Sequence, residues 1–283
     1  MPSTLEQIRD QQRETWDRFS HGWKKWDHHV LNWLAPVGDQ LIQSAALKDT
    51  DHVLDVAAGT GEPGLTAALR VPKGTVTATD LSERMLEVAA ENARHRGIGN
   101  FLTRRCDAGA MPFADDSFDA VLCRFGFMFF PDVETGLDEC VRVAKPGGRV
   151  CAAVWGPPER NPWATTVMGT IGHYVDMPAP PPGAPGLFRC AAPGAMEAAF
   201  RKAGLRDVAL HEIGGELGFR TPDEYWTFMT EIAAPVVAGL GKADEPTRAK
   251  IKEAVLALAH QASKNGQPRL PWLALTVSGV KAR

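Results

Sequence analysis

The residues best suited to chemistry are a glycine-rich segment and the acidic residues around it. The segment reads DVAAGTGEPG over residues 55–64, between an apolar run and the start of a helical pattern. Its glycines let the backbone approach a ligand closely, and the free N–H groups of the helix N-terminus can contact that ligand. Gly59, Gly61 and Gly64 also satisfy the G-x-G-x-x-G fingerprint of dinucleotide sites. Alone this match is a weak signal, because a turn without a ligand can have the same composition.

Two further carboxylates follow the next two apolar runs. Asp80 ends the β-rich run at 75–79, where it can accept hydrogen bonds from both hydroxyls of a ribose. The alternative is a solvated aspartate that caps the following helix. Asp107 follows a weak strand at 101–103 and is placed to receive an adenine amino group, or else is an ordinary turn aspartate. A glycine turn and two strand-end carboxylates together describe a nucleoside site.

Two nucleoside cofactors fit this arrangement, a nicotinamide dinucleotide and S-adenosylmethionine. Asp55, before the turn, would repel a pyrophosphate but suits the ammonium and sulfonium of S-adenosylmethionine. The last two predicted strands, at about 207–213 and 273–277, form the antiparallel ending typical of methyltransferases. No segment after the fourth predicted strand is typical of a hydride-transfer site. These features favour S-adenosylmethionine.

Alternating strands and helices must position these residues. The predicted strands are 52–56, 75–79, 101–103, 120–123, 149–155, 207–213 and 273–277. The predicted helices are 5–34, 65–69, 82–96, 133–143, 196–203, 222–240 and 246–263. The β-α-β-α alternation predicts an α/β fold with a parallel sheet wrapped by helices. The stretch after residue 155 is irregular for about 35 residues, and the proline-rich run at 178–185 predicts a stiff linker.

Five segments resemble, in order, the motifs of class I S-adenosylmethionine-dependent methyltransferases, specifically the ubiquinone/menaquinone-biosynthesis-like group of small-molecule methyltransferases. They read VLDVAAGTG at 53–61, ATDLSERML at 78–86, CDA at 106–108, MPFADDSFD at 111–119 and VRVAKPGGR at 141–149. The resemblance covers about residues 50–155. It implies a Rossmann-like, seven-stranded, mostly parallel sheet, with S-adenosyl-L-methionine as cofactor and S-adenosyl-L-homocysteine as product. Ala57 departs from the pattern, because the family usually has its first glycine there.

The resemblance also implies contacts to the cofactor. Gly59 and Gly61 face the methionine moiety, Asp80 the ribose, Leu81 and Met85 the adenine, and Asp107 with Ala108 its amino edge. The remaining predicted contacts are Asp55, Ala57, Thr60, Arg124 and Phe125. Arg124 lines either the cofactor carboxylate or an anionic substrate.

Tryptophan is concentrated at the N-terminus, where four of the eight residues fall within the first 35. A stripe of one apolar residue every three or four positions predicts a helix over 5–34, which Gly22 can split and which Pro36 and Gly38 end. The stripe has two interpretations. It packs against the sheet, or it forms a lid over the cofactor with Trp23 and Trp26 facing the pocket.

The methyl acceptor should lie beyond the carboxyl ends of the strands. The segment RFGFMFF at 124–130 lies there and lacks the Asn/Asp-Pro-Pro-aromatic motif of enzymes that methylate nucleic acids. Phe127 is either a pocket residue or core, and Trp163 lies in an insertion expected to cover the acceptor. The weak candidates for a catalytic residue are His28, His29, His173 and Arg124. An aromatic cover suggests a phenol, quinol, polyketide or aromatic acid.

Length and the motifs together predict one core with covers. The predicted divisions are a helical lid at 1–45, the cofactor-binding core at 46–155, a cap insertion at 156–192, and the rest of the core at 193–283 with a helical insertion at about 222–265. The 31 Lys and Arg residues against 34 Asp and Glu give a net charge of −3, which argues against nucleic acid and anionic membranes. No run is apolar enough to span a membrane and no export signal is visible, so we expect a cytoplasmic location.

The predicted function is methyl transfer to an oxygen or carbon of a small, aromatic or apolar molecule. The alternatives are a non-catalytic nucleoside-binding regulatory protein and, less favoured, a nicotinamide-dependent oxidoreductase. The five cysteines are scattered, so free thiols and no metal site are expected. The oligomeric state stays open between monomer and homodimer.

Overall fold

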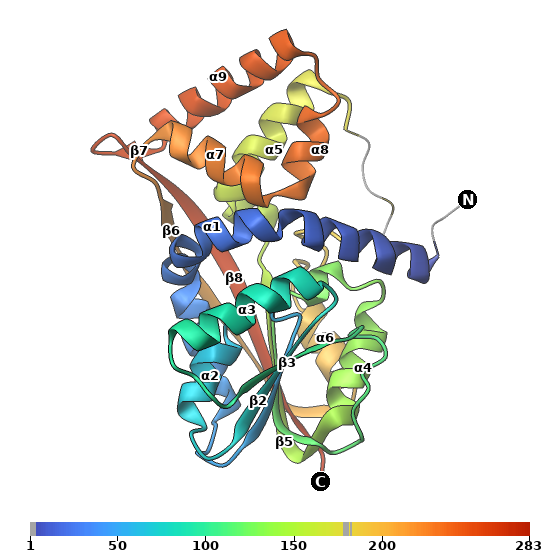
Figure 1. Cartoon of the computed structure of the whole chain (residues 1–283). Helices are drawn as coiled ribbons and strands as arrows, with labels where there is room; N and C mark the ends of the chain where they lie inside the picture. Colours follow the sequence, from blue (N-terminus) through green and yellow to red (C-terminus); the bar gives the residue numbers. More distant parts are fainter. Residues whose placement is uncertain (1–3, 178–180, 182) are drawn as a thin grey trace.

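The apolar runs form one sheet with strand order β3-β2-β1-β4-β5-β8-β6, as seen in the computed structural model (Figure 1). The structure describes residues 4–177, 181 and 183–283. The strands are β1 (His52–Val56), β2 (Thr75–Asp80), β3 (Phe101–Arg105), β4 (Phe118–Arg124), β5 (Ala144–Trp155), β6 (Leu205–Gly218) and β8 (Gln267–Lys281). The first five pair in parallel, and β8 is antiparallel to both neighbours. The predicted Rossmann-like, seven-stranded, mostly parallel sheet is confirmed. A two-residue strand, β7 (Ser263–Lys264), pairs with β8 off this path.

Helices cover both faces of the sheet, as its parallel strands require. The helices α2 (Gly64–Arg70), α3 (Glu83–His95) and the second half of α1 (Leu5–Ala45) pack on one face, and α4 (Val133–Val143) and α6 (Ala195–Lys202) on the other (Figure 1). The central strands are apolar on both sides; Val53 and Leu54 of β1 are fully buried. The sheet is therefore a rigid platform whose carboxyl-end loops carry the predicted site.

Helix α1 is one continuous helix of 41 residues, so the predicted end at Pro36 and the possible break at Gly22 are wrong. Pro36 lies inside the helix, where a proline removes one hydrogen bond and costs about 3 kcal/mol. The helix continues because Val37 and Leu41 beyond the proline are fully buried. Each such side chain contributes roughly 1.5–3 kcal/mol, so their burial offsets the cost of the proline.

Two other predicted elements need correction. The stretch after residue 155 contains a helix, α5 (Pro162–Tyr174), although its sequence is rich in Gly and Thr. The single helix expected at 222–240 is two, α7 (Pro222–Ile232) and α8 (Ala234–Leu240), because Pro235 cannot continue α7 and instead lies in the first turn of α8. The last helix is α9 (Glu245–Gln261). Of the predicted proline-rich linker, positions 178–180 and 182 lie outside the described residues.

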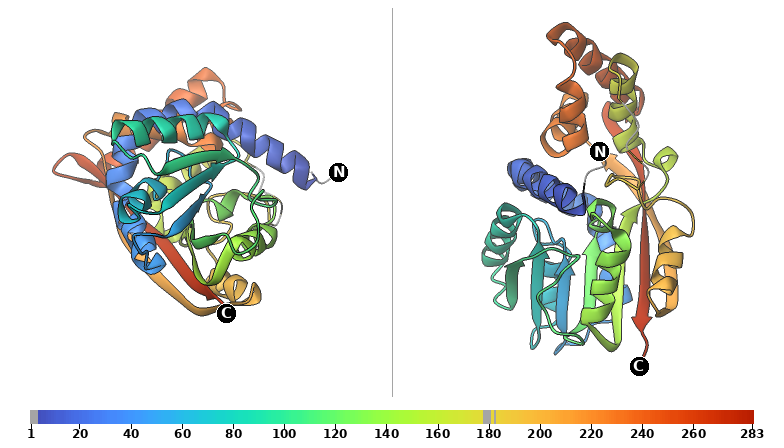
Figure 2. Two further views of the ribbon diagram at one scale, coloured as in Figure 1. Left: turned by 60° about the horizontal axis from the view of Figure 1, so that its bottom comes forward. Right: turned by 90° about the vertical axis from the view of Figure 1, so that its right-hand side faces the viewer.

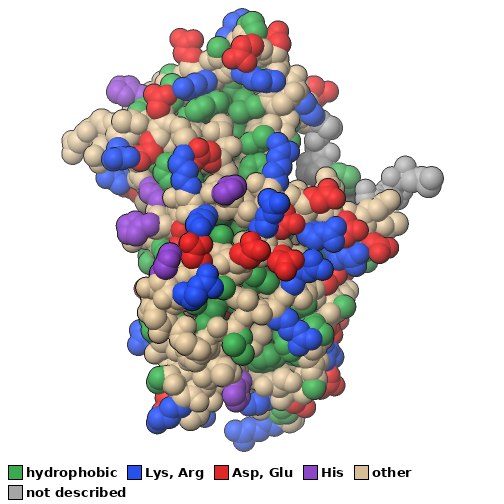
Figure 3. All heavy atoms as spheres, viewed as in Figure 1, with side chains coloured by type: hydrophobic (Ala, Val, Ile, Leu, Met, Phe, Trp, Pro, Cys, Tyr) green, Lys and Arg blue, Asp and Glu red, His purple; other side chains and the backbone are tan. Residues whose placement is uncertain are grey.

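The cap is the group of helices α5, α7, α8 and α9, which pack on one another beyond the carboxyl ends of the strands. The long antiparallel pair β6–β8 extends from the core to this cap, and α1 crosses between the two layers (Figure 2). Both strands are longer than predicted. In β6 the strand continues through Gly214 and Gly215, because both residues pair with β8. A belt of charged side chains crosses the molecule at the level of α1 (Figure 3). No described helix has the length and apolarity needed to cross a membrane.

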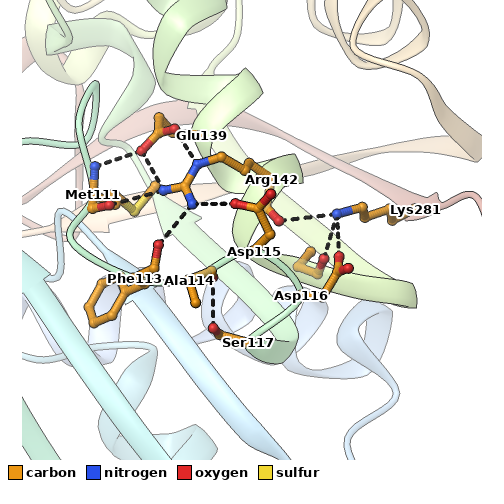
Figure 4. A network of polar contacts seen from close by, with 10 residues as sticks. Met111, Phe113, Ala114, Asp115, Asp116, Ser117, Glu139, Arg142 and Lys281 are labelled. Atoms are coloured by element: carbon orange, nitrogen blue, oxygen red, sulfur yellow. Dashed lines mark hydrogen bonds and ion pairs between the residues drawn. The ribbon is translucent and has the colours of Figure 1, made fainter.

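Two of the family-like segments form a polar network centred on Arg142 of α4 (Figure 4). Its guanidinium donates to the carbonyls of Met111 at 2.9 Å and Phe113 at 2.8 Å, and pairs with Glu139 and Asp115. Hydrogen bonds from Arg142 hold the pKa of Glu139 below its usual value. The network fixes the loop at 111–117 that follows Asp107, so these two segments serve structure.

Candidate functional site

The glycine-rich turn has the backbone conformation that its sequence suggests. Ala57 and Gly59 both have φ of 55°, and Gly61 has φ of 115°. A Cβ added at Gly61 would lie 2.8 Å from Leu65 Cδ1, whereas one added at Gly59 would meet nothing within 4 Å. Ala57 thus adopts the left-handed conformation that glycine favours, at a cost of roughly 1–2 kcal/mol. The turn leaves open space above Gly59, where a ligand can approach the backbone.

Asp80 connects the end of β2 to this turn. Its Oδ2 accepts a hydrogen bond from the Gly59 N–H at 2.9 Å, and its Oδ1 accepts one from the Ser82 N–H at 2.8 Å. The side chain is buried, and burial raises its pKa to about 6. The alternative of a solvated cap is therefore wrong; the Ser82 hydroxyl caps α3 by accepting from the Met85 N–H. Each Asp80 oxygen keeps a lone pair that can accept from a ribose hydroxyl.

The residues predicted around the adenine lie along the next strand ends. Leu81 is half-buried directly after β2, and Met85 is buried in the first turn of α3. Asp107 and Ala108 are half-buried after β3. The Asp107 Oδ1 accepts from the Gly109 N–H at 2.8 Å, and its Oδ2 lies 3.9 Å from the Arg9 Nη1 of α1. Asp107 is thus both a turn residue and a half-exposed acceptor at the predicted edge.

Asp55 and Arg124 are ionisable groups without complete partners. Asp55 is fully buried; its Oδ2 accepts from the Gly64 N–H at 2.8 Å, and its Oδ1 has no hydrogen-bond partner in the described part of the chain. Burial raises its pKa to about 8. The Arg124 guanidinium, at the end of β4, makes no hydrogen bond or ion pair with any described residue, and burial lowers its pKa.

This pair tests whether the site fits S-adenosylmethionine. The amino-acid end of that molecule carries one carboxylate and one ammonium. Arg124 can donate to the carboxylate, and the unpartnered Oδ1 of Asp55 can accept from the ammonium. A buried polar atom without a partner is costly, so a ligand that completes it is favoured. The residues present fit the cofactor.

Aromatic rings gather beyond the ends of β4 and β5. We call this the aromatic cluster; its members are Trp33, Phe125, Trp155, Trp163 and Trp272. Phe125 stacks on Trp155 with ring centroids 4.3 Å apart, and Trp155 stacks on Trp33 at 5.5 Å. Phe125 and Trp163 are among the site residues predicted from the sequence, whereas Trp33, Trp155 and Trp272 are not. Trp155 could have been found from its place at the end of a strand, whereas Trp272 is brought there only by the β8 pairing.

The two predicted lid residues face different layers. Trp23 lies near Trp16 at 6.2 Å, and Trp16 in turn contacts Phe129 beyond β4 at 5.0 Å. Trp26 packs against α7 instead, where its Nε1 donates to Glu231 at 2.6 Å. Trp26 thus packs on the cap helices and not over a cofactor pocket, whereas the lid role of Trp23 stays a prediction.

The weak catalytic candidates are not brought together. His28 is exposed and bonds Asn32 at 3.2 Å, and His173 is exposed at the end of α5. His29 is half-buried, with its ring 5.5 Å from that of Phe228, and its Nε2 has no partner within the described residues. Burial lowers the His29 pKa, so the ring is neutral at neutral pH. Phe127 is fully buried in a short helix, which fits its interpretation as core.

Comparisons with known proteins agree with this geometry. A family model described as a methyltransferase domain matches residues 53–148. A demethylmenaquinone methyltransferase from Bacteroides fragilis is 30% identical over 184 residues, which cover 60% of this chain and 71% of that protein. An uncharacterized protein from Mycobacterium tuberculosis is 39% identical over 122 residues, so the match spans only 43% of that relative. The YcgJ protein of Bacillus subtilis has the same fold, with a TM-score of 0.56 and 22% identity over 87% of this chain and 98% of that one.

The matched domain and the strand order of the sheet are those of an S-adenosylmethionine-dependent methyltransferase. Within that class, the chain belongs to the ubiquinone/menaquinone-biosynthesis-like family of methyltransferases. S-adenosylmethionine is the cofactor that this family uses.

Proposed function

We propose that the protein transfers a methyl group from S-adenosylmethionine to an oxygen or carbon of a small aromatic or apolar acceptor. The observation that carries the proposal is the aromatic cluster, which lies beside the glycine turn at the carboxyl ends of β4 and β5. The four tryptophans of the cluster are buried against one another, and Phe125 is its half-buried member. The ring of Phe125 is therefore the face on which a flat apolar acceptor would stack, with the tryptophans excluding water behind it. The relative named as a demethylmenaquinone methyltransferase supports an electron-rich ring, such as a quinol, as acceptor.

The chain's own residues bind and orient the reactants. Asp80 accepts from the ribose hydroxyls, Asp107 from the adenine amino group, and Arg124 with Asp55 binds the amino-acid end. When bound, the cofactor supplies a methyl group already activated by the positive sulfur. Alignment of the two reactants then supplies most of the catalysis, because correct orientation lowers the activation free energy by roughly 7–11 kcal/mol.

His29 is the histidine that supports a proton-accepting role for a hydroxyl acceptor. Its neutral ring borders the aromatic cluster through Phe228, whose ring lies 6.1 Å from that of Trp33. A base is needed only where the acceptor is not already ionised or electron-rich. We therefore assign His29 the role of accepting the hydroxyl proton in O-methylation; in C-methylation of a quinol the ring carbon that gains the methyl group must lose its own proton, to His29 or to water.

Methyl-labelled S-adenosylmethionine, incubated with a panel of phenols, reduced quinols and aromatic carboxylates, tests the proposal. We expect label in at least one member, with the quinols favoured. Tight binding of S-adenosylhomocysteine with no transfer to any member would favour the nucleoside-binding regulatory protein. Binding of NADH without S-adenosylhomocysteine would favour the oxidoreductase.

A further inference from the structure

Helix α1 has four buried polar side-chain atoms with no hydrogen-bond partner in the described part of the chain, and Trp23 and Asp27 contribute two of them; the others are the Nε2 of His29 and the Nε1 of Trp33. The Nε1 of Trp23 is a donor and the Oδ1 of Asp27 is an acceptor, and neither has a hydrogen-bond partner among residues 4–177, 181 and 183–283. The two residues are four apart in one helix, so they lie on the same face, one turn from each other. A buried donor and a buried acceptor side by side require a ligand that has both an acceptor and a donor.

This face of α1 lies on the glycine turn. The Asn92 side chain of α3 donates to the Asp27 Oδ2 at 3.2 Å and to the Thr60 carbonyl of the turn at 3.0 Å. The Asn92 side chain therefore bridges the Asp27 carboxyl and the backbone of the turn. Burial raises the Asp27 pKa, and the Thr60 side chain, then the positive charge of Arg96 and then that of Arg124 partly offset this rise.

A further incomplete group lies within reach of the same cation. The Oδ1 of Asp55 is buried and unpartnered within the described chain, and the carboxylates of Glu62, Asp55 and Asp27 all favour the charged form of Arg124. Asp55 belongs to the sheet and Asp27 to the helix that covers it. Asp27, Asp55 and Arg124 thus lie within electrostatic reach of one another, and Trp23 lies one helical turn from Asp27.

We infer that Trp23 and Asp27 of α1 bind the amino-acid end of the cofactor, with Asp27 accepting from the ammonium and Trp23 donating to the carboxylate. The inference rests on the proposed use of S-adenosylmethionine. Helix α1 is then part of the binding site and not only a cover. The site selects a nucleoside with a zwitterionic amino-acid substituent over the same nucleoside without one.

The test compares two ligands by isothermal titration calorimetry on the full chain. S-adenosylhomocysteine has the amino-acid end, and 5′-methylthioadenosine has the same nucleoside without it. We expect Asp27→Asn to weaken S-adenosylhomocysteine about tenfold to a hundredfold, as loss of one charge-assisted hydrogen bond does, and to leave 5′-methylthioadenosine within about twofold. Trp23→Phe should weaken the first ligand severalfold with the same selectivity.

Two controls separate binding from folding. Asp39→Asn makes the same change at an exposed position of α1 and should alter neither affinity. Asp27→Asn should unfold at the wild-type temperature or above it without ligand, because it removes a buried charge. Equal weakening of both ligands, or no weakening of S-adenosylhomocysteine, would overturn the role of Asp27. Wild-type protein that does not bind S-adenosylhomocysteine would overturn the proposed function itself.

Discussion

At the scale of single residues, the site depends on carboxylates buried before any ligand arrives. Asp55 and Asp80 are both buried, and burial raises the pKa of both. Each accepts backbone hydrogen bonds that only partly compensate for lost hydration. The ligand-free protein therefore stores unfavourable free energy at the cofactor site, and a ligand with matching donors releases it.

Replacing Asp80 tests the ribose contact. Asp80→Ala removes up to two hydrogen bonds to a charged group, each worth roughly 1.5–3 kcal/mol, so affinity for S-adenosylhomocysteine should fall about tenfold to several hundredfold. Calorimetric titration measures this loss. An unchanged affinity would remove Asp80 from the binding site, provided that circular dichroism shows the variant to be folded.

Asp55 gives a prediction about pH. Its pKa of about 8 exceeds the unfolded value near 3.8, so between these pH values the folded protein binds more protons than the unfolded chain. Its contribution to stability is thus lost as pH rises, by at most about 1.4 kcal/mol per pH unit. Asp55→Asn cannot titrate, so without ligand it should gain stability relative to wild type from pH 5 to pH 8. Urea unfolding of both proteins at three pH values measures this difference, and a constant difference would contradict the prediction.

Motif residues could be predicted from the sequence, whereas Asp27 could not. Asp55 and Asp80 follow apolar runs, so their place at strand ends is visible from local pattern. Asp27 lies beside the tryptophan stripe, and a polar residue off an apolar stripe is normally solvent-facing. The residue is half-buried and its Oδ1 is fully buried, because α1 is covered on more than one side, which no local pattern shows.

At the scale of elements, α1 is the piece that joins the two halves of the site. Asp27 is linked to the glycine turn through the Asn92 side chain, whereas Trp26 contacts α7 of the cap and Trp33 belongs to the aromatic cluster. The apolar stripe predicted the helix correctly over its first thirty residues. The predicted end of the helix was wrong. The helix-breaking effect of Pro36 can be read from the sequence, whereas the burial of Leu41, which outweighs it, cannot.

The approach of α1 to α7 depends on one glycine. A Cβ at Gly22 would lie 2.0 Å from the Glu231 carbonyl oxygen of α7. Gly22→Ala should therefore lower the melting temperature, because overpacking costs roughly 1–3 kcal/mol against a gain of about 1 kcal/mol in helix propensity. Gly38→Ala is the matched control, since its Cβ would meet nothing within 4 Å, and should raise the melting temperature. Differential scanning calorimetry compares them; equal shifts would show that the contact with α7 is not restrictive.

At the scale of the whole molecule, a rigid sheet is linked to a helical cap by the long β6–β8 pair and by α1 (Figure 2). The cofactor residues belong to the sheet and α1, whereas the cap contributes Trp163 to the aromatic cluster. The alternation of strands and helices was enough to predict the sheet. The cap could not be placed from sequence, because it is defined by packing among helices that are distant along the chain.

This division predicts where cofactor binding slows hydrogen exchange. In the proposed binding mode S-adenosylhomocysteine contacts the turn at 57–61 and the face of α1 with Trp23 and Asp27, so amides at 57–61 and at 16–30 should gain protection. Those of α9, which packs on other cap helices and on β8, should not. Mass spectrometry of exchange with and without ligand measures this. In Asp27→Asn at saturating ligand, protection should persist at 57–61 and fall at 16–30, because α1 loses its contact while the sheet keeps its own. Equal protection of α9 and α1 would instead mean that ligand binding stabilises the cap and the sheet together.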